Sequence, residues 1–167
     1  MIRTLLVVVV VVVVLVVLAA MAWGWRRRGR RQDALLPALD TTPPAELGDV
    51  VVAAAEGLYV GSTFADSWQD RVVSGGLGRR AAATATLYTS GALFDRQGDT
   101  PVFVPRAAMA GARVEPALAG KVLGRGGLLV VRWNSGDHDL DTGFRADDRS
   151  TYVAWIRALD TDRETTS

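Results

Sequence analysis

The sequence contains no cysteine, one histidine, and one lysine among its 19 basic residues. The absence of cysteine excludes disulfide bonds, zinc sites built from thiolates and catalysis by a thiol. His138 is the single histidine, and no evident nucleophile accompanies it; a lone histidine in a strand is usually structural. We therefore expect no catalytic residue, no metal ion and no cofactor, and we do not expect an enzyme.

A long apolar run stands at the N-terminus, where residues 5–22 are unbroken by any polar side chain and include eight consecutive valines. An 18-residue helix is about 27 Å long, close to the roughly 30 Å hydrocarbon core of a bilayer. We predict a transmembrane helix here, within an anchor that covers residues 1–25. A cleaved signal peptide is the alternative, because Ala20 and Ala22 resemble a cleavage site, but the length of the run favours a retained anchor.

Arginines follow the apolar run directly and set the predicted orientation. Positive charge next to a span stays on the cytoplasmic side, so we predict a single-pass plasma-membrane protein with its N-terminus outside and its C-terminal domain in the cytoplasm. The same arginines, with three more from two glycine-rich loops, are candidate contacts for anionic lipid headgroups. These candidates are Arg26, Arg27, Arg28, Arg30, Arg31, Arg79, Arg80 and Arg125.

The remainder of the chain is acidic. Residues 32–167 carry 13 basic and 18 acidic side chains, a net charge of −5, although the whole chain has a formal charge of +1. Domains that bind nucleic acid cluster their basic residues on one surface. We therefore expect no nucleic-acid partner.

The chain divides into four parts on composition. The anchor is followed by residues 26–48, whose arginines and prolines predict a basic juxtamembrane segment and a semi-rigid linker. Residues 49–160 are sufficient for one small domain with its own core. Residues 161–167 are expected to form a disordered tail.

Short segments rich in Val, Leu, Thr and Tyr, separated by glycine-containing turns, predict an antiparallel β domain. The first of three expected hairpins turns at Glu56 and Gly57. The three hairpins are expected in residues 50–63, 84–95 and 128–144. Further strands are expected over residues 102–104, 113–118 and 121–123, and a short helix over residues 64–72.

The spacing of the apolar residues changes at the end of the domain. Tyr152, Trp155 and Leu159 recur at three- and four-residue spacing, which predicts one amphipathic helix. About seven strands followed by such a helix is the layout of a pleckstrin-homology (PH)-like barrel, in which Trp155 would anchor the helix in one open end. The predicted fold is thus one N-terminal transmembrane α-helix plus a mainly-β domain, a PH-like antiparallel barrel of about seven strands capped by a C-terminal α-helix.

Several segments carry a resemblance to a known family. They are EGLYVGST at residues 56–63, WQDR at 68–71, GLGR at 76–79, the strand around Leu87 and the helix around Trp155. On these segments the chain resembles a family of small actinobacterial membrane proteins with one N-terminal span and a cytoplasmic bacterial PH-like domain. The resemblance implies a membrane-tethered binding or scaffolding module and supplies no established site residues.

Four aspartates, Asp137, Asp139, Asp141 and Asp148, have the spacing of ligands in an EF-hand calcium loop. Thr142 stands where that loop requires glycine, and the last position has an aspartate in place of the bidentate glutamate. We therefore expect solvent-facing carboxylates on a strand and no metal site.

A protein-interaction module is the function that these observations favour, with an unidentified protein as its partner. A barrel can bind a peptide by adding it as a strand along an exposed sheet edge, which requires no particular residue type. An anionic-lipid headgroup sensor is the first alternative, and an accessory subunit of a membrane transport or export complex is the second.

Overall fold

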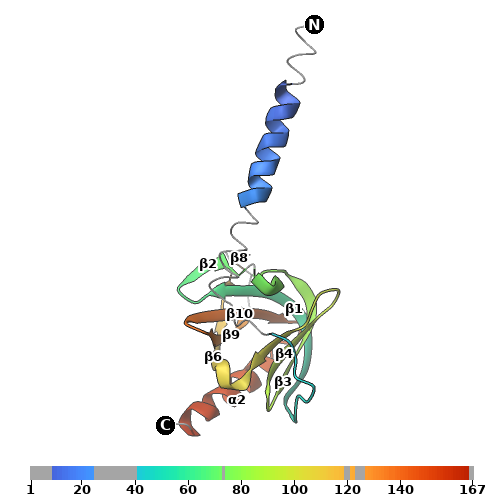
Figure 1. Ribbon diagram of the computed structural model, residues 1–167. Helices are drawn as coiled ribbons and strands as arrows, with labels where there is room; N and C mark the ends of the chain where they lie inside the picture. Colours follow the sequence, from blue (N-terminus) through green and yellow to red (C-terminus); the bar gives the residue numbers. More distant parts are fainter. Residues whose placement is uncertain (1–8, 25–40, 73, 119–120, 123–126, 166–167) are drawn as a thin grey trace.

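The computed structural model describes residues 9–24, 41–72, 74–118, 121–122 and 127–165 (Figure 1). A strongly bent antiparallel sheet forms the body, and one helix packs against it. The strands and helices of the body are β1 (Val50–Phe64), β2 (Ser67–Arg71), η1 (Ser74–Gly76), β3 (Ala81–Tyr88), β4 (Gly91–Arg96), β5 (Val102–Pro105), η2 (Arg106–Ala108), β6 (Met109–Glu115), β7 (Ala117–Leu118), β8 (Lys121–Val122), β9 (Leu128–Ser135), β10 (His138–Ala146) and α2 (Thr151–Thr165).

The main sheet has the strand order β5-β4-β3-β1-β10-β9-β6, and β2 pairs with β1 beside this path. Every pairing in it is antiparallel, while β7 and β8 form a separate two-stranded ladder. The predicted mainly-β, antiparallel arrangement with a C-terminal helix is confirmed. Among the hairpins, those over residues 84–95 and 128–144 are confirmed as the pairs β3–β4 and β9–β10.

The hairpin predicted over residues 50–63 is wrong, because these residues form one continuous strand. β1 pairs with β3 along Val50–Tyr59 and with β10 along Gly57–Phe64, so it joins the two halves of the sheet (Figure 1). Gly57 lies where the two ladders overlap, and a side chain there would collide with the backbone carbonyl of Arg145. The glycine permits a close approach of two strands and makes no turn.

The helix predicted over residues 64–72 is also wrong, since β2 occupies most of this stretch. Thr63 stands opposite Arg71 in the β1–β2 ladder, and the backbone N–H of Val72 donates to the carbonyl of Ser62 at 2.9 Å. The free strand edge of β1 supplies backbone hydrogen bonds that override the helical spacing of the side chains.

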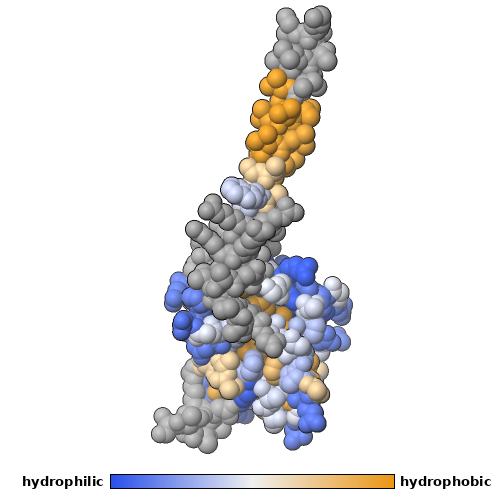
Figure 2. Space-filling view, in the orientation of Figure 1, coloured by the Kyte–Doolittle hydropathy of each residue, from blue (hydrophilic) through white to orange (hydrophobic). Residues whose placement is uncertain are grey.

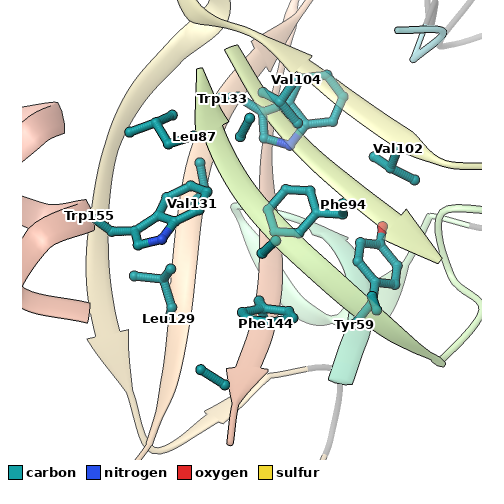
Figure 3. Packing of buried hydrophobic residues seen from close by; sticks show 14 of the residues in the cluster. Tyr59, Leu87, Phe94, Val102, Val104, Leu129, Val131, Trp133, Phe144 and Trp155 are labelled. Atoms are coloured by element: carbon teal, nitrogen blue, oxygen red, sulfur yellow. The ribbon is translucent and has the colours of Figure 1, made fainter. Parts of the chain in front are cut away.

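Aromatic side chains fill the core between the sheet and α2 (Figure 3). Phe94 lies at the centre, with ring centroids 5.8 Å from Tyr59, 6.0 Å from Phe144 and 6.1 Å from Trp155. Trp155 is fully buried and enters this cluster from α2. Its predicted role as the anchor of the helix agrees with this packing.

The N-terminal helix covers residues 9–24 of the described chain, and its large apolar side chains are half or more exposed, from Val9 at 50% to Met21 at 67% (Figure 2). Among the described residues, no helix is both sufficiently long and sufficiently apolar to cross a bilayer. The transmembrane helix predicted over residues 5–22 is therefore wrong. The 16 helical residues extend about 24 Å, short of the roughly 30 Å hydrocarbon core, and residues 5–8 lie outside the described residues.

Removing the indole of Trp155 is expected to destabilise the domain more than truncating an exposed side chain on the outer face of α2. Trp155→Ala deletes a fully buried side chain that contacts Phe94 and should lower the free energy of unfolding by about 3–5 kcal/mol. Val153→Ala, on the same helix but with a 59% exposed side chain, should change it by less than about 0.5 kcal/mol. Urea denaturation followed by far-ultraviolet circular dichroism measures both, and equal losses would contradict the packing described.

Candidate functional site

The N-terminal half of β1 has an unpaired edge. β3 pairs with this half along one side, whereas the ladder with β10 on the other side begins at Gly57. The backbone N–H of Asp147 donates to the carbonyl of Glu56 at 2.9 Å and ends the contact with the β10 side. Beyond that bond, residues 50–55 have no strand on their second edge within the part of the chain that the structure describes.

The side chains of this unpaired stretch are apolar and largely exposed. Val50 is 58% exposed and Val51 is 45% exposed, and Ala53 and Ala54 are also exposed, while Val52 points into the core. Natural proteins usually protect an open edge with lysine, proline or a bulge, because an open edge pairs readily with another chain. The six residues VVVAAA have no charged side chain and no proline, although irregular register breaks the ladder to β3 at two places.

A groove of about 600 Å³ runs along this edge. One wall is residues 51–56 of β1, and the opposite wall contains Asp147 and Asp148 with Thr151 and Ala154 from the first turns of α2. Six consecutive strand residues line it, so the groove follows the edge of the strand and does not lie over one face of the sheet. Its volume lies within the range of sites that bind small ligands or peptide side chains.

The rim of the groove is acidic. Glu56, Asp147 and Asp148 are exposed, and none of the ten residues that line the groove is basic. The Asp148 carboxylate accepts hydrogen bonds from the backbone N–H of Ser150 at 2.9 Å and from its hydroxyl at 2.8 Å. These bonds hold the pKa of Asp148 below its ordinary value, so this carboxylate is ionised at neutral pH.

The arginines proposed as lipid contacts fall mostly outside the described residues, which include neither Arg26, Arg27, Arg28, Arg30 and Arg31 nor Arg125. Arg79 and Arg80 are described, and both are exposed just before β3. The Arg79 guanidinium forms an ion pair with the carboxylate of Asp99 at 2.7 Å. The structure therefore brings two of the eight candidates together, and one of these two already has an anionic partner.

Arg96, which the sequence analysis did not single out, fixes the loop that carries Arg79. Its buried guanidinium donates to the carbonyls of Thr100 and Gly76, each at 2.8 Å, and lies 5.0 Å from the centroid of the Tyr59 ring. The Tyr59 hydroxyl donates to the carbonyl of Leu77 at 3.0 Å. Burial raises the pKa of Tyr59 to about 12, so the hydroxyl stays protonated and keeps this donor role at neutral pH.

The aspartates that resemble a calcium loop do not form a metal site. Among the described residues, no group of three or more histidine, aspartate or glutamate side chains could hold a metal ion. The expectation that these carboxylates all face solvent is wrong for Asp141, which is 3% exposed and accepts two hydrogen bonds each from Arg113 and Arg132. These bonds join β6, β9 and β10. They outweigh the effect of burial and hold the pKa of Asp141 below its ordinary value.

Loss of the Asp141 charge is expected to destabilise the domain in a pH-dependent way. Asp141→Asn leaves two guanidinium groups without their carboxylate and should lower the free energy of unfolding by about 2 kcal/mol at neutral pH. Because the pKa is lower in the folded state, the ionised carboxylate stabilises the domain above about pH 4, and this contribution is lost as the pH falls further.

Urea denaturation of the wild type and of the Asp141→Asn variant at a series of pH values measures this effect. The difference between the two should shrink on acidification below about pH 4, whereas Asp137→Asn, in the exposed β9–β10 turn, should leave stability nearly unchanged. A difference that stays constant down to about pH 2 would contradict the assigned role of the carboxylate.

Comparison with known proteins places the domain in a family. A family model described as Bacterial PH domain-like matches residues 36–160. No curated protein matches the chain. One similar solved structure is titled "Vav1 inhibited by an allosteric inhibitor: Vav1 inhibitors block GEF activity". The two chains are 14% identical, with a TM-score of 0.40, and the match covers 81% of this chain and 33% of the chain in that structure. This chain therefore spans about a third of the length of the chain that it matches. The matched region covers most of the sequence and coincides with the bent sheet and α2, and the chain belongs to the bacterial PH domain-like family.

Proposed function

We propose that the domain is a binding module that takes up an extended segment of another protein as an additional strand on the free edge of β1. The unpaired edge over residues 50–55 carries this proposal. Membership of the bacterial PH domain-like family supports a binding or scaffolding role. Strand addition would supply the backbone hydrogen bonds that this edge lacks, and the groove would receive alternate side chains of the added strand.

The two end strands of the main sheet path, β5 and β6, are less suited to this role. At the β5 edge, the backbone N–H of Phe103 already donates to the carbonyl of Thr41 at 2.8 Å. Pro101 precedes this strand and Pro105 is its last residue. At the opposite end of the sheet, α2 lies against β6. The β1 edge combines exposed apolar side chains with an adjoining groove, which favours it as the binding surface.

An anionic-lipid headgroup sensor is the alternative taken from the sequence. It would use Arg79 and Arg80 in the part of the chain that is described, and the ion pair of Arg79 with Asp99 lowers the net charge available there. The β1 edge combines an unpaired ladder with an adjoining groove, so we place strand addition first. The cytoplasmic location of the domain and a role as an accessory subunit of a transport complex stay predictions.

Hydrogen exchange of the backbone amides of residues 50–55 tests strand addition directly. The full-length chain, kept in a mild detergent because its N-terminal helix exposes apolar side chains, would be mixed with heptapeptides of alternating threonine and valine. The peptides carry arginine, glutamine or glutamate at both ends. We expect at least one of them to slow exchange on the unpaired edge, since added-strand hydrogen bonds protect amides.

Peptides of the same sequence with alternate backbone nitrogens methylated serve as the control. They keep every side chain but cannot complete the ladder, so they should give no protection. If no peptide in the set protects residues 50–55, or if the methylated peptides protect them equally, strand addition at β1 is wrong.

A further inference from the structure

We infer that the groove beside β1 selects an extended segment whose apolar stretch is flanked at both ends by arginine or lysine. This inference rests on the proposed function and names the chemistry of the partner. Its basis is the distribution of charge around an apolar edge.

Acidic side chains stand at both ends of the unpaired stretch. Asp49 directly precedes it and is exposed, although it does not line the groove. Glu56 directly follows it, with Asp147 and Asp148 on the facing wall. The basic residues nearest in sequence to that wall, Arg145 and Arg149, are not among the residues that line the groove. A strand added along residues 50–55 would therefore have a carboxylate near each of its ends, Asp49 at one and Glu56 at the other, whichever direction its chain runs.

Between the acidic ends the surface is apolar. Val51, Ala53 and Ala54 are exposed, and the small alanine side chains leave room for larger residues on an added strand. The lining stretch of residues 51–56 extends about 20 Å at about 3.3 Å per residue, which matches a segment of about six residues. Val and Thr, which are favoured in strands, suit the centre of such a segment.

Charge also argues against a second copy of this chain as the occupant. In an antiparallel pairing of two copies centred between Val52 and Ala53, Glu56 of each copy would lie opposite Asp49 of the other. Like charges directly opposite one another destabilise a ladder. A partner with basic flanks replaces these two repulsions with attractions.

Binding of the three heptapeptides to the full-length chain measures this selectivity, with fluorescence anisotropy of a labelled peptide as the readout. The peptide with arginine ends should bind on the order of threefold to tenfold tighter than the one with glutamine ends, and the glutamate-ended peptide should bind weakest. The preference should shrink as sodium chloride is raised from about 0.05 M to about 0.5 M, because the charges are exposed and screened by salt.

The double variant Glu56→Gln with Asp147→Asn should lose most of the preference for arginine ends. Both side chains are exposed, so the variant should keep its fold, which its thermal unfolding midpoint checks. The matched control, Asp95→Asn with Asp137→Asn, removes the same charge from exposed positions that do not line the groove and should keep the preference.

Each outcome separates the inference from the function on which it rests. Tight binding of glutamine-ended and arginine-ended peptides alike, with protection of residues 50–55, would overturn the charge selectivity and leave strand addition standing. If Asp95→Asn with Asp137→Asn loses the preference for arginine ends as fully as Glu56→Gln with Asp147→Asn does, the preference comes from the overall negative charge of the domain. That result would overturn the inference. Protection of residues 50–55 that rises with protein concentration, without peptide, would identify a second copy as the occupant and likewise overturn it.

Discussion

The long strand β1 pairs with three other strands in this domain, and its two edges are not paired over the same residues. β1 pairs with β3 through its first part and with β10 through its last part, and the two ladders overlap at Gly57, where the strands approach too closely for any side chain. The sheet can bend around the core because β1 changes partners. The same change leaves the edge of residues 50–55 unpaired, so the geometry that builds the barrel also creates the edge that we propose as its binding surface.

The rest of the barrel is held by interactions that keep this strand in place. Phe94, Phe144 and Trp155 pack against Tyr59 or one another in the core, and Arg96 lies over the Tyr59 ring while it bonds the loop before β3. The carboxylate of Asp141 joins β6, β9 and β10 on the far side of the sheet from that core. A frame that held the open edge in one conformation would lower the entropic cost of the strand addition that we propose.

The sequence predicts much of this fold because local signals agree with the tertiary structure. The strand-rich segments on either side of a glycine-containing turn in residues 84–95, and the spacing around Trp155, each specify an element that the structure contains. The prediction failed at Glu56 and Gly57, where glycine was taken as a turn residue and instead permits two strands to meet.

The sequence analysis missed the open edge of β1, the buried position of Asp141 and the length of the N-terminal helix, because each depends on more than local sequence. The run VVVAAA is apolar on both faces of a strand, and this pattern could have indicated a strand with an open edge. That the edge is unpaired depends on where the ladder with β10 ends, which the local sequence does not specify. Asp141 looked like one of a row of solvent-facing carboxylates, because its two arginine partners come from distant strands. The transmembrane prediction counted apolar residues, whereas the described helix is shorter than the run.

The most direct measurement of the central claim is the position of a bound strand by nuclear magnetic resonance. In a complex of the full-length chain with the arginine-ended peptide, nuclear Overhauser effects between backbone protons should connect the peptide to residues 51–55 of β1, in the regular pattern of a β ladder. Contacts confined to β6, to the loop around Arg79 or to the face of α2 away from the groove would contradict the account.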